Sequence, residues 1–181
     1  FLDTGLMRAD EPKQVAAFFA KNGIELQIWD VREKFFDALK SRTDPEEKRK
    51  AFRDTFYRVF GQAVRSYSAD ILIQGTILTD IIETQKGIKT QHNVLQQAGI
   101  NPILYGLQVL EPLRELTKPQ ARSVARHMGL PPKIFNRWPF PGPGLALRVV
   151  GEVTPERIET VRRATAVVEK ELQSPSIFQA F

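Results

Sequence analysis

The run from Ala69 to Thr76, ADILIQGT, constrains the fold more than any other segment of the chain. It is short, apolar and rich in β-branched residues, and it ends at Gly75. Because apolar and polar residues do not alternate along it, it predicts a strand buried on both faces, as in a parallel sheet. Further strands are predicted at FLDTGL (1–6), IELQIWDV (24–31) and YGLQVLEPL (105–113).

Amphipathic helices are predicted between these strands. They cover residues 12–23, 32–39, 45 to about 66, and 117–130. The third begins with Asp44 as N-cap and Pro45 in its first turn, and the fourth has Thr117 as N-cap and Gly129 as its stop. Strands that alternate with helices predict an open α/β sheet of βαβ units.

The stretch NRWPFPGPGLALRVVGEV, residues 136–153, interrupts this alternation. It holds three prolines and two glycines within residues 139–144 and then becomes aliphatic. We expect a stiff connection here, followed by a strand over 145–153 and a helix from Thr154 to about Leu172. This change of texture predicts a domain boundary near residues 137–145.

Composition narrows the class of protein. A chain of 181 residues with 42% hydrophobic and 26% charged residues is typical of a soluble globular protein, and no apolar run reaches the ~20 residues of a membrane span. The net charge of +5 comes from basic residues spread along the chain, so no nucleic-acid footprint is predicted. Without cysteine, disulfides and thiolate metal sites are excluded, which suits a reducing, cytoplasmic location. The uncapped FLDTG start, which lacks an initiating Met, indicates a fragment of a longer product.

Two loops qualify for ligand binding, because ligands in open α/β sheets bind beyond the carboxyl ends of the strands. They are DTGLMR (3–8) and GTILTD (75–80). Gly75 lets a ligand approach the backbone closely, and Thr76 offers a hydroxyl. Asp80 and Glu83 lie three residues apart on one helical face and could hold Mg²⁺. Alternatively, they solvate a helix start, where acids suit the helix dipole.

The segment GIKTQHN, residues 87–93, reads as a mobile loop over a polar site, with Lys89 able to neutralise phosphate charge; a solvated surface loop is the alternative. His92 and His127 are the only histidines and lie far apart in sequence, which argues against a two-histidine metal site. His127 is expected near a helix C-terminus.

Three phenylalanines, Phe52, Phe56 and Phe60, recur at helical spacing. This periodicity favours a core face over a platform for stacking bases.

Taken together, several segments resemble the glutamine-hydrolysing GMP synthetases. They are FLDTGLMR, TDPEEKRK, ADILIQGTILTDIIET, IKTQHNV, LEPLREL and NRWPFPGPGLALRVVGEVTPE, in the family's order and over nearly the whole chain. The resemblance implies a Rossmann-like adenine nucleotide α-hydrolase fold, the ATP pyrophosphatase domain, over residues 1–138. The start of a small α+β dimerisation domain would follow over 139–181.

The resemblance also implies an activity. The family adenylates the C2 oxygen of xanthosine monophosphate with Mg²⁺ and ATP, releasing pyrophosphate, and ammonia then displaces AMP to give GMP. The ammonia comes from glutamine through a fused glutaminase domain or a separate subunit. Because this chain has no cysteine, the glutaminase nucleophile is not within it. A homodimer formed through the C-terminal domain is expected.

Site residues follow from the same resemblance. Leu2 and Asp3 match the strand end that holds adenine, Phe56 matches an aromatic residue near the adenine, and Gly75 and Thr76 match the contact with the AMP portion. The remaining matches are Asp80 and Glu83 beside the metal and phosphates, Lys89 on the phosphates, His92 and Asn93 closing the lid, and Arg137 on the phosphate of the purine nucleotide.

Four departures from the family pattern concern the site. The family's S-G-G-x-D-S loop and its C-terminal K-P-P-x-T-I-E-W-E are not in the sequence. The lid has Gln91 in place of a histidine, and residues 95–106 replace the usual G-G-L-P. Two alternative interpretations are another pyrophosphatase of this group, either NAD synthetase-like or tRNA-thiolating, and a non-catalytic nucleotide-binding scaffold. The related pyrophosphatases are not expected to carry PFPGPG.

Overall fold

The computed structural model describes residues 1–67, 69–85, 107–136, 138 and 140–172. The chain divides into two compact units, residues 1–56 with 138–181 (unit 1) and residues 57–137 (unit 2). The division falls inside the long helix α3, Pro45–Tyr67. In the parts of the chain that the structure describes, no helix is long and apolar enough to cross a bilayer.

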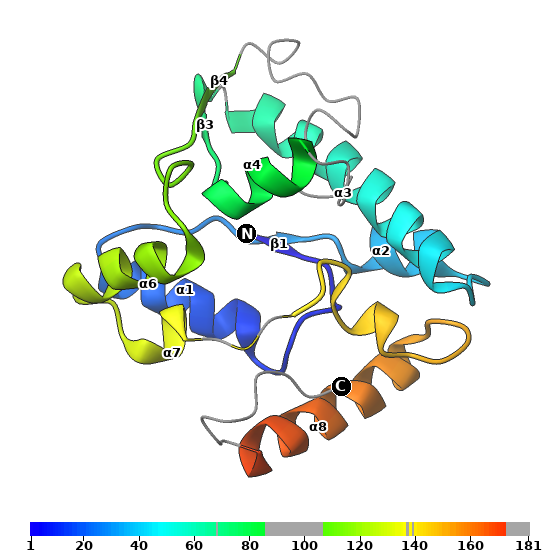
Figure 1. Cartoon of the computed structure of the whole chain (residues 1–181). Coiled ribbons are helices and arrows are strands. Elements are labelled where there is room, and N and C mark those ends of the chain that lie inside the picture. Colours follow the sequence, from blue (N-terminus) through cyan, green and yellow to red (C-terminus); the bar gives the residue numbers. More distant parts are fainter. Residues whose placement is uncertain (68, 86–106, 137, 139, 173–181) are drawn as a thin grey trace. The chain divides into compact units, whose positions relative to one another are not determined.

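Unit 1 begins with a small βαβ arrangement. Strand β1 (Leu2–Asp3) is followed by helix α1 (Glu11–Lys21), strand β2 (Trp29–Asp30) and helix α2 (Arg32–Leu39). The two strands pair in parallel, with Leu2 opposite Trp29 and Asp3 opposite Asp30. Figure 1 labels β1, α1 and α2 of this arrangement. The predicted helices at 12–23 and 32–39 are confirmed. Of the strand predicted over 24–31, only two residues pair.

Helices α3 and α8 (Pro155–Glu171) start where their caps predict. The Asp44 carboxylate accepts hydrogen bonds from the backbone N–H groups of Glu46 and Glu47, both at 2.9 Å. The Thr154 hydroxyl accepts one from the N–H of Arg157 at 3.3 Å. These caps satisfy N–H groups that lack a partner within the helix, which explains why each helix begins at its proline.

The strand predicted over 145–153 is wrong. Residues Gly144–Leu147 form a short 3-10 helix, η2, and the N–H groups of Arg148 and Val149 both bond to the carbonyl of Leu145 at 2.9 and 3.2 Å. The backbone groups that a strand would offer to a sheet are therefore used locally. Leu145 and Ala146 are fully buried. Leu145 and Ala146 are therefore apolar because they lie in the core of unit 1, and not because they belong to a strand.

The core of unit 1 draws on all parts of that unit. Its most buried apolar side chains are Leu6, Val31, Phe35, Leu39, Leu145, Ala146, Val149 and Ile158. Full burial of a side chain such as Leu or Phe contributes about 1.5–3 kcal/mol each. Phe52 extends this core, with its ring 4.9 Å from that of Phe35 and 6.1 Å from that of Phe56. These contacts agree with the predicted core face of α3.

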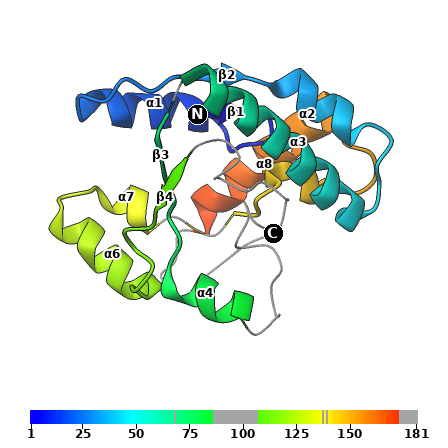
Figure 2. The ribbon, with the colours of Figure 1, turned by 90° about the horizontal axis from the view of Figure 1, so that it is seen from above.

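Unit 2 contains a second parallel pair, β3 (Ile71–Ile73) and β4 (Gln108–Leu110), with helices α4 (Leu78–Gln85), α6 (Lys118–His127) and α7 (Pro132–Phe135) (Figure 2). Helix α6 starts with a capping box between Thr117 and Gln120, and Gly129 follows its end at φ 77°. His127 is the last residue of α6, as the sequence predicts.

The predicted burial of the ADILIQGT strand on both faces is wrong. Ile71 and Ile73 are 55% and 68% exposed, and Val109 and Leu110 beside them are also exposed. Among the described residues, each of these strands pairs on one side only, because the sheet has two strands there. The α/β class with parallel strands is confirmed, whereas the described residues form two separate two-stranded sheets and not one open sheet. The domain division at 138/139 stays a prediction.

Lys48 ties α3 to the end of the aliphatic run. Its side chain is 1% exposed, and its Nζ donates a hydrogen bond to the carbonyl of Val149 at 2.7 Å. Burial, followed by the charge of Arg157, lowers the pKa of Lys48, while Asp44 acts in the opposite direction. The ammonium group is thus held in the core by one strong hydrogen bond.

Gly144 should not tolerate a side chain. A Cβ there would lie 2.2 Å from the carbonyl oxygen of Leu6, and its φ is 61°. We expect Gly144→Ala to lower the free energy of unfolding by roughly 3 kcal/mol or more, measured by urea denaturation. Gly142→Ala, two residues away, is the control, because a Cβ there would meet nothing within 4 Å. Equal effects of the two substitutions would contradict the structure.

Lys48 should give stability an alkaline pH dependence. Its folded pKa is lowered, so the unfolded chain binds the proton more tightly and the free energy of unfolding rises with pH between the folded pKa and the ordinary value of 10.5. Urea denaturation from about pH 7 to about pH 10 should show the wild type gaining stability relative to Lys48→Met. Lys50→Met, at an exposed position of the same helix, should track the wild type. A constant gap between wild type and Lys48→Met would contradict this account.

Candidate functional site

The segment Thr4–Arg8 follows β1 and is called the β1 loop. Asp3, predicted to hold adenine, uses its Oδ1 to accept a hydrogen bond from the N–H of Gly5 at 3.0 Å. The Thr4 hydroxyl accepts one from the N–H of Leu6 at 3.3 Å. Short polar side chains at the strand end thereby set the turn, which is how Asp and Thr act in Asx and ST turns.

Gly5 is required by the shape of the β1 loop. Its φ is 73°, a region that side chains disfavour, and a Cβ would lie 2.9 Å from Cγ of Arg32 and 3.0 Å from the ring of Phe36. The loop therefore packs directly on α2. Leu2 and Asp3, at the strand end before it, are both half-buried.

Asp30 joins Asp3 at the same edge of the sheet, because the two residues are register partners at the ends of parallel strands. Asp30 binds Arg32 through both carboxylate oxygens, at 2.9 and 2.5 Å. This hydrogen bonding lowers the pKa of Asp30 to about 2 and, with the charges of Asp30 and Asp3, raises the pKa of Arg32. Sequence reasoning missed Asp30, although its position at the end of a predicted strand could have indicated it.

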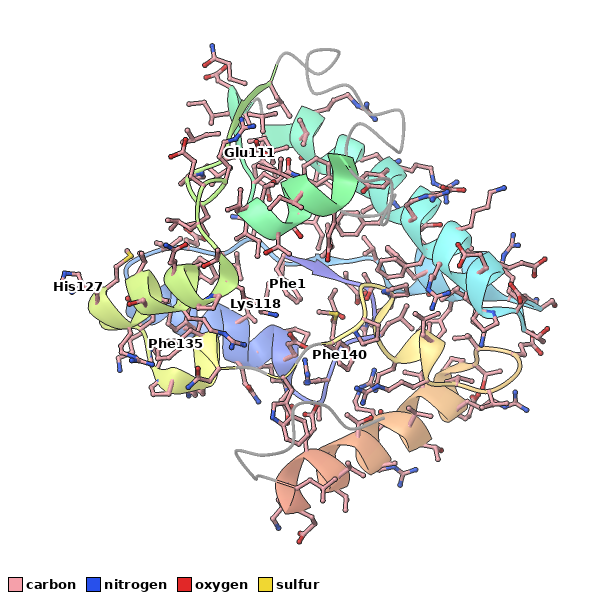
Figure 3. All side chains as sticks on the ribbon, in the orientation of Figure 1. Phe1, Glu111, Lys118, His127, Phe135 and Phe140 are labelled. Atoms are coloured by element: carbon pink, nitrogen blue, oxygen red, sulfur yellow. The ribbon has the colours of Figure 1, made fainter. Side chains whose placement is uncertain are left out.

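A cationic cluster lies beside the β1 loop. The guanidinium carbon of Arg8 is 4.1 Å from the ring centroid of Phe140, and that of Arg148 is 5.0 Å from the same centroid (Figure 3 labels Phe140). Arg8 Nε donates to both oxygens of Glu169, at 2.8 and 3.2 Å, and Arg148 donates to Thr165 at 3.0 Å.

The electrostatic effects on Arg148 oppose one another. Burial lowers the pKa of Arg148, while Glu169 acts to raise it and Arg8 acts to lower it. Sequence reasoning missed Phe140, whose ring lies against the guanidinium groups of both Arg8 and Arg148.

In unit 2, Gly75 follows β3 and is exposed. A Cβ there would meet no atom within 4 Å, so packing does not demand a glycine. The close approach of a ligand to the backbone, as the sequence predicts, remains a reason for this residue.

The Thr76 hydroxyl donates a hydrogen bond within unit 2. It donates to Oε1 of Glu111 at 2.6 Å, and Glu111 follows β4 (Figure 3). The backbone hydrogen bonding between β3 and β4 extends beyond β3, because the N–H of Gln74 donates to the carbonyl of Leu110 at 2.9 Å. A nucleotide contact by Thr76 would use its backbone or the hydroxyl oxygen as acceptor.

Asp80 caps the first turn of α4. Its Oδ2 accepts a hydrogen bond from the N–H of Ile77 at 3.0 Å, which is the role that the helix-start interpretation predicts. A carboxylate has further lone pairs, so this bond is compatible with a metal contact. Glu83 follows one turn later on the same helix.

Metal binding by these acids needs ligands from elsewhere. Within the described residues, no group of three or more His, Cys, Asp or Glu side chains could hold a metal ion. Magnesium bound to nucleotides takes one or two carboxylates and completes its shell with phosphates and water. A role of Asp80 and Glu83 as such carboxylates stays a prediction.

Four predicted site residues lie outside the described residues. They are Lys89, His92, Asn93 and Arg137. Phe56 is described and half-buried, with its ring stacked at 6.1 Å on that of Phe52. It stands in the core face of α3, and a role beside adenine stays a prediction.

Comparison with curated proteins finds relatives along the whole chain. It is 52% identical over 182 residues to a subunit of the glutamine-hydrolysing GMP synthase of Archaeoglobus fulgidus, covering 100% of this chain and 58% of that protein. The corresponding subunits of Methanopyrus kandleri and Pyrococcus furiosus are each 48% identical, covering 96% and 100% of this chain and 54% and 58% of their own lengths. No family model matches. The resemblance to GMP synthetases is confirmed, and the chain spans a little over half the length of these relatives.

The bond between Thr76 and Glu111 should contribute to stability. Thr76→Val removes the donor and leaves the part-buried Glu111 oxygen without it, so we expect the free energy of unfolding to fall by about 1–2 kcal/mol in urea denaturation. Thr76→Ser should restore most of the loss. Thr79→Val, at an exposed position nearby, is the control. An unchanged midpoint for Thr76→Val would show that the bond contributes nothing.

Proposed function

We propose that this chain is the ATP-activating part of a GMP synthase, with its nucleotide-binding residues in a Rossmann-like domain. In this reaction, ATP adenylates the C2 oxygen of xanthosine monophosphate and releases pyrophosphate, and ammonia then displaces AMP to give GMP. The observation that carries the proposal is identity of about half of all residues, over the whole chain, to subunits of glutamine-hydrolysing GMP synthases. The alternatives, an NAD synthetase-like or tRNA-thiolating pyrophosphatase or a scaffold, have no comparable support.

The adenine and ribose side of ATP is assigned to the strand ends. Leu2 and Asp3 precede a turn that is stabilised by the hydrogen bond from the N–H of Gly5 to the Asp3 carboxylate. The backbone at this strand end is therefore ordered without a ligand. Gly75 leaves the backbone open, and Thr76 follows it. Phe56 is proposed as the aromatic residue near adenine.

The phosphate side requires positive charge, because an anionic purine oxygen must attack a phosphate that carries a polyanionic leaving group. Mg²⁺, when bound with ATP, supplies part of that charge, and Asp80 and Glu83 are the residues proposed to hold it. Lys89 is proposed to neutralise phosphate charge, with His92 and Asn93 closing the site and Arg137 binding the phosphate of xanthosine monophosphate through paired hydrogen bonds. Orientation of the two nucleotides supplies much of the remaining rate enhancement.

The relatives also indicate a partner. Each is named as one subunit of a glutamine-hydrolysing enzyme, which implies a separate glutaminase subunit as the source of ammonia. We further propose a cytoplasmic homodimer, formed through a dimerisation domain that begins at residue 139.

The test measures AMP release by the full-length protein with ATP, Mg²⁺, xanthosine monophosphate and ammonia. We expect release that depends on xanthosine monophosphate. Absence of AMP release from a folded sample would contradict the proposal.

Asp80→Asn separates the two roles of that residue, because an amide oxygen can still cap α4 but lacks the charge that favours Mg²⁺. We expect a loss of turnover on the order of 100-fold with the thermal midpoint little changed. Glu115→Gln, an exposed acid of the same unit, is the charge-matched control. Loss of stability in parallel with turnover would assign Asp80 to the helix cap alone.

A further inference from the structure

The carbonyl groups of the β1 loop are held by residues far along the chain. Arg162, on α8, donates from Nη2 to the carbonyl of Gly5 and from Nε to the carbonyl of Met7, the latter at 3.1 Å. The carbonyl of Leu6, between them, accepts from the N–H of Leu145 at 2.8 Å. Three successive carbonyls of this loop are thus bonded to the segment that follows residue 138.

Arg162 can set the shape of the loop because its guanidinium group is planar and its donors have fixed directions. Binding two carbonyls that are two residues apart fixes their spacing and orientation. The Arg162 side chain is 21% exposed, so water competes weakly for these donors, and its Nη1 is paired with Glu159. A lysine has a single ammonium group and cannot reproduce this planar two-point contact.

The loop held in this way directly follows Asp3, the predicted nucleotide contact. Gly5 within it has φ 73°, one of several backbone regions open to glycine, so the contacts around the loop select this conformation. Loss of the α8 contacts would free the loop to sample other conformations, and ordering it again would reduce the free energy of ligand binding.

We propose that Arg162 is a positioning residue that holds the β1 loop in the conformation that binds ATP. The inference rests on the proposed function for the identity of the nucleotide. It assigns a role in nucleotide binding to helix α8, whose Arg162 lies 155 residues beyond Met7 in sequence.

The test compares three variants of the full-length protein: Arg162→Ala, Arg162→Lys and Arg163→Ala. The last is the control, because Arg163 is exposed, adjacent and of equal charge. Equilibrium binding of ATP is measured by calorimetry, and the KM values for ATP and ammonia by AMP release. We expect Arg162→Ala to weaken ATP binding about ten-fold and Arg162→Lys about three-fold. The KM for ammonia and the behaviour of Arg163→Ala should stay within about two-fold of wild type.

Hydrogen exchange shows whether Arg162 holds the loop itself, while the ATP affinity shows whether that matters for binding. Amide exchange within residues 4–8 should increase in Arg162→Ala, relative to Arg163→Ala, under conditions where both variants are folded by circular dichroism. Should Arg162→Ala fail to fold, Arg162→Lys decides the matter, and ATP affinity equal to wild type would overturn the proposal.

Failure of the proposed function would be recognised separately. Wild-type protein that binds ATP but releases no AMP with xanthosine monophosphate contradicts the synthase assignment. The ATP affinities of the three variants still decide the role of Arg162 in that case, and equal affinities in Arg162→Ala and Arg163→Ala overturn it.

Discussion

One backbone hydrogen bond organises unit 1: the N–H of Leu145 donates to the carbonyl of Leu6 at 2.8 Å. It requires glycine at the preceding position, because any Cβ on Gly144 would collide with that carbonyl. The bond joins the Pro/Gly stretch to the turn after the first strand, and it places Leu6 and Leu145, both fully buried, in one core. Gly144 therefore allows a close backbone approach. The predicted strand after this stretch is replaced by a 3-10 helix, and the stiffness of the connection stays a prediction.

Charged side chains complete this attachment. Arg8 pairs with Glu169 and stacks on Phe140, Arg162 binds the loop carbonyls, and Lys48 binds the carbonyl that ends the aliphatic run. All of these cations are partly or fully buried and bonded to oxygen atoms, which is the condition under which buried charge is tolerated. The loop proposed to bind ATP is thus built jointly by the first and last parts of the described chain.

Helices were predictable from sequence because their signals are local. Asp44, Thr117 and Thr154 each mark a helix start that the structure confirms. The nature of the 145–153 run was not predictable, since periodicity cannot distinguish a buried strand from an irregular buried segment. The exposure of β3 was missed for a related reason, because burial depends on neighbours and not on the strand's own composition.

The candidate site was predictable only in part. Motifs pointed to Asp3, Gly75 and Asp80, and the structure adds the bonds that constrain the turn at Asp3 and the helix start at Asp80. The contacts of Arg162 have no sequence signature, because they join residues brought together only by the fold. The central claim is that the C-terminal segment holds the β1 loop, and a double-mutant cycle on Arg8 and Glu169 tests it most directly. The account predicts a coupling free energy of about 1 kcal/mol or more from urea denaturation, and additive effects of Arg8→Ala and Glu169→Ala would contradict it.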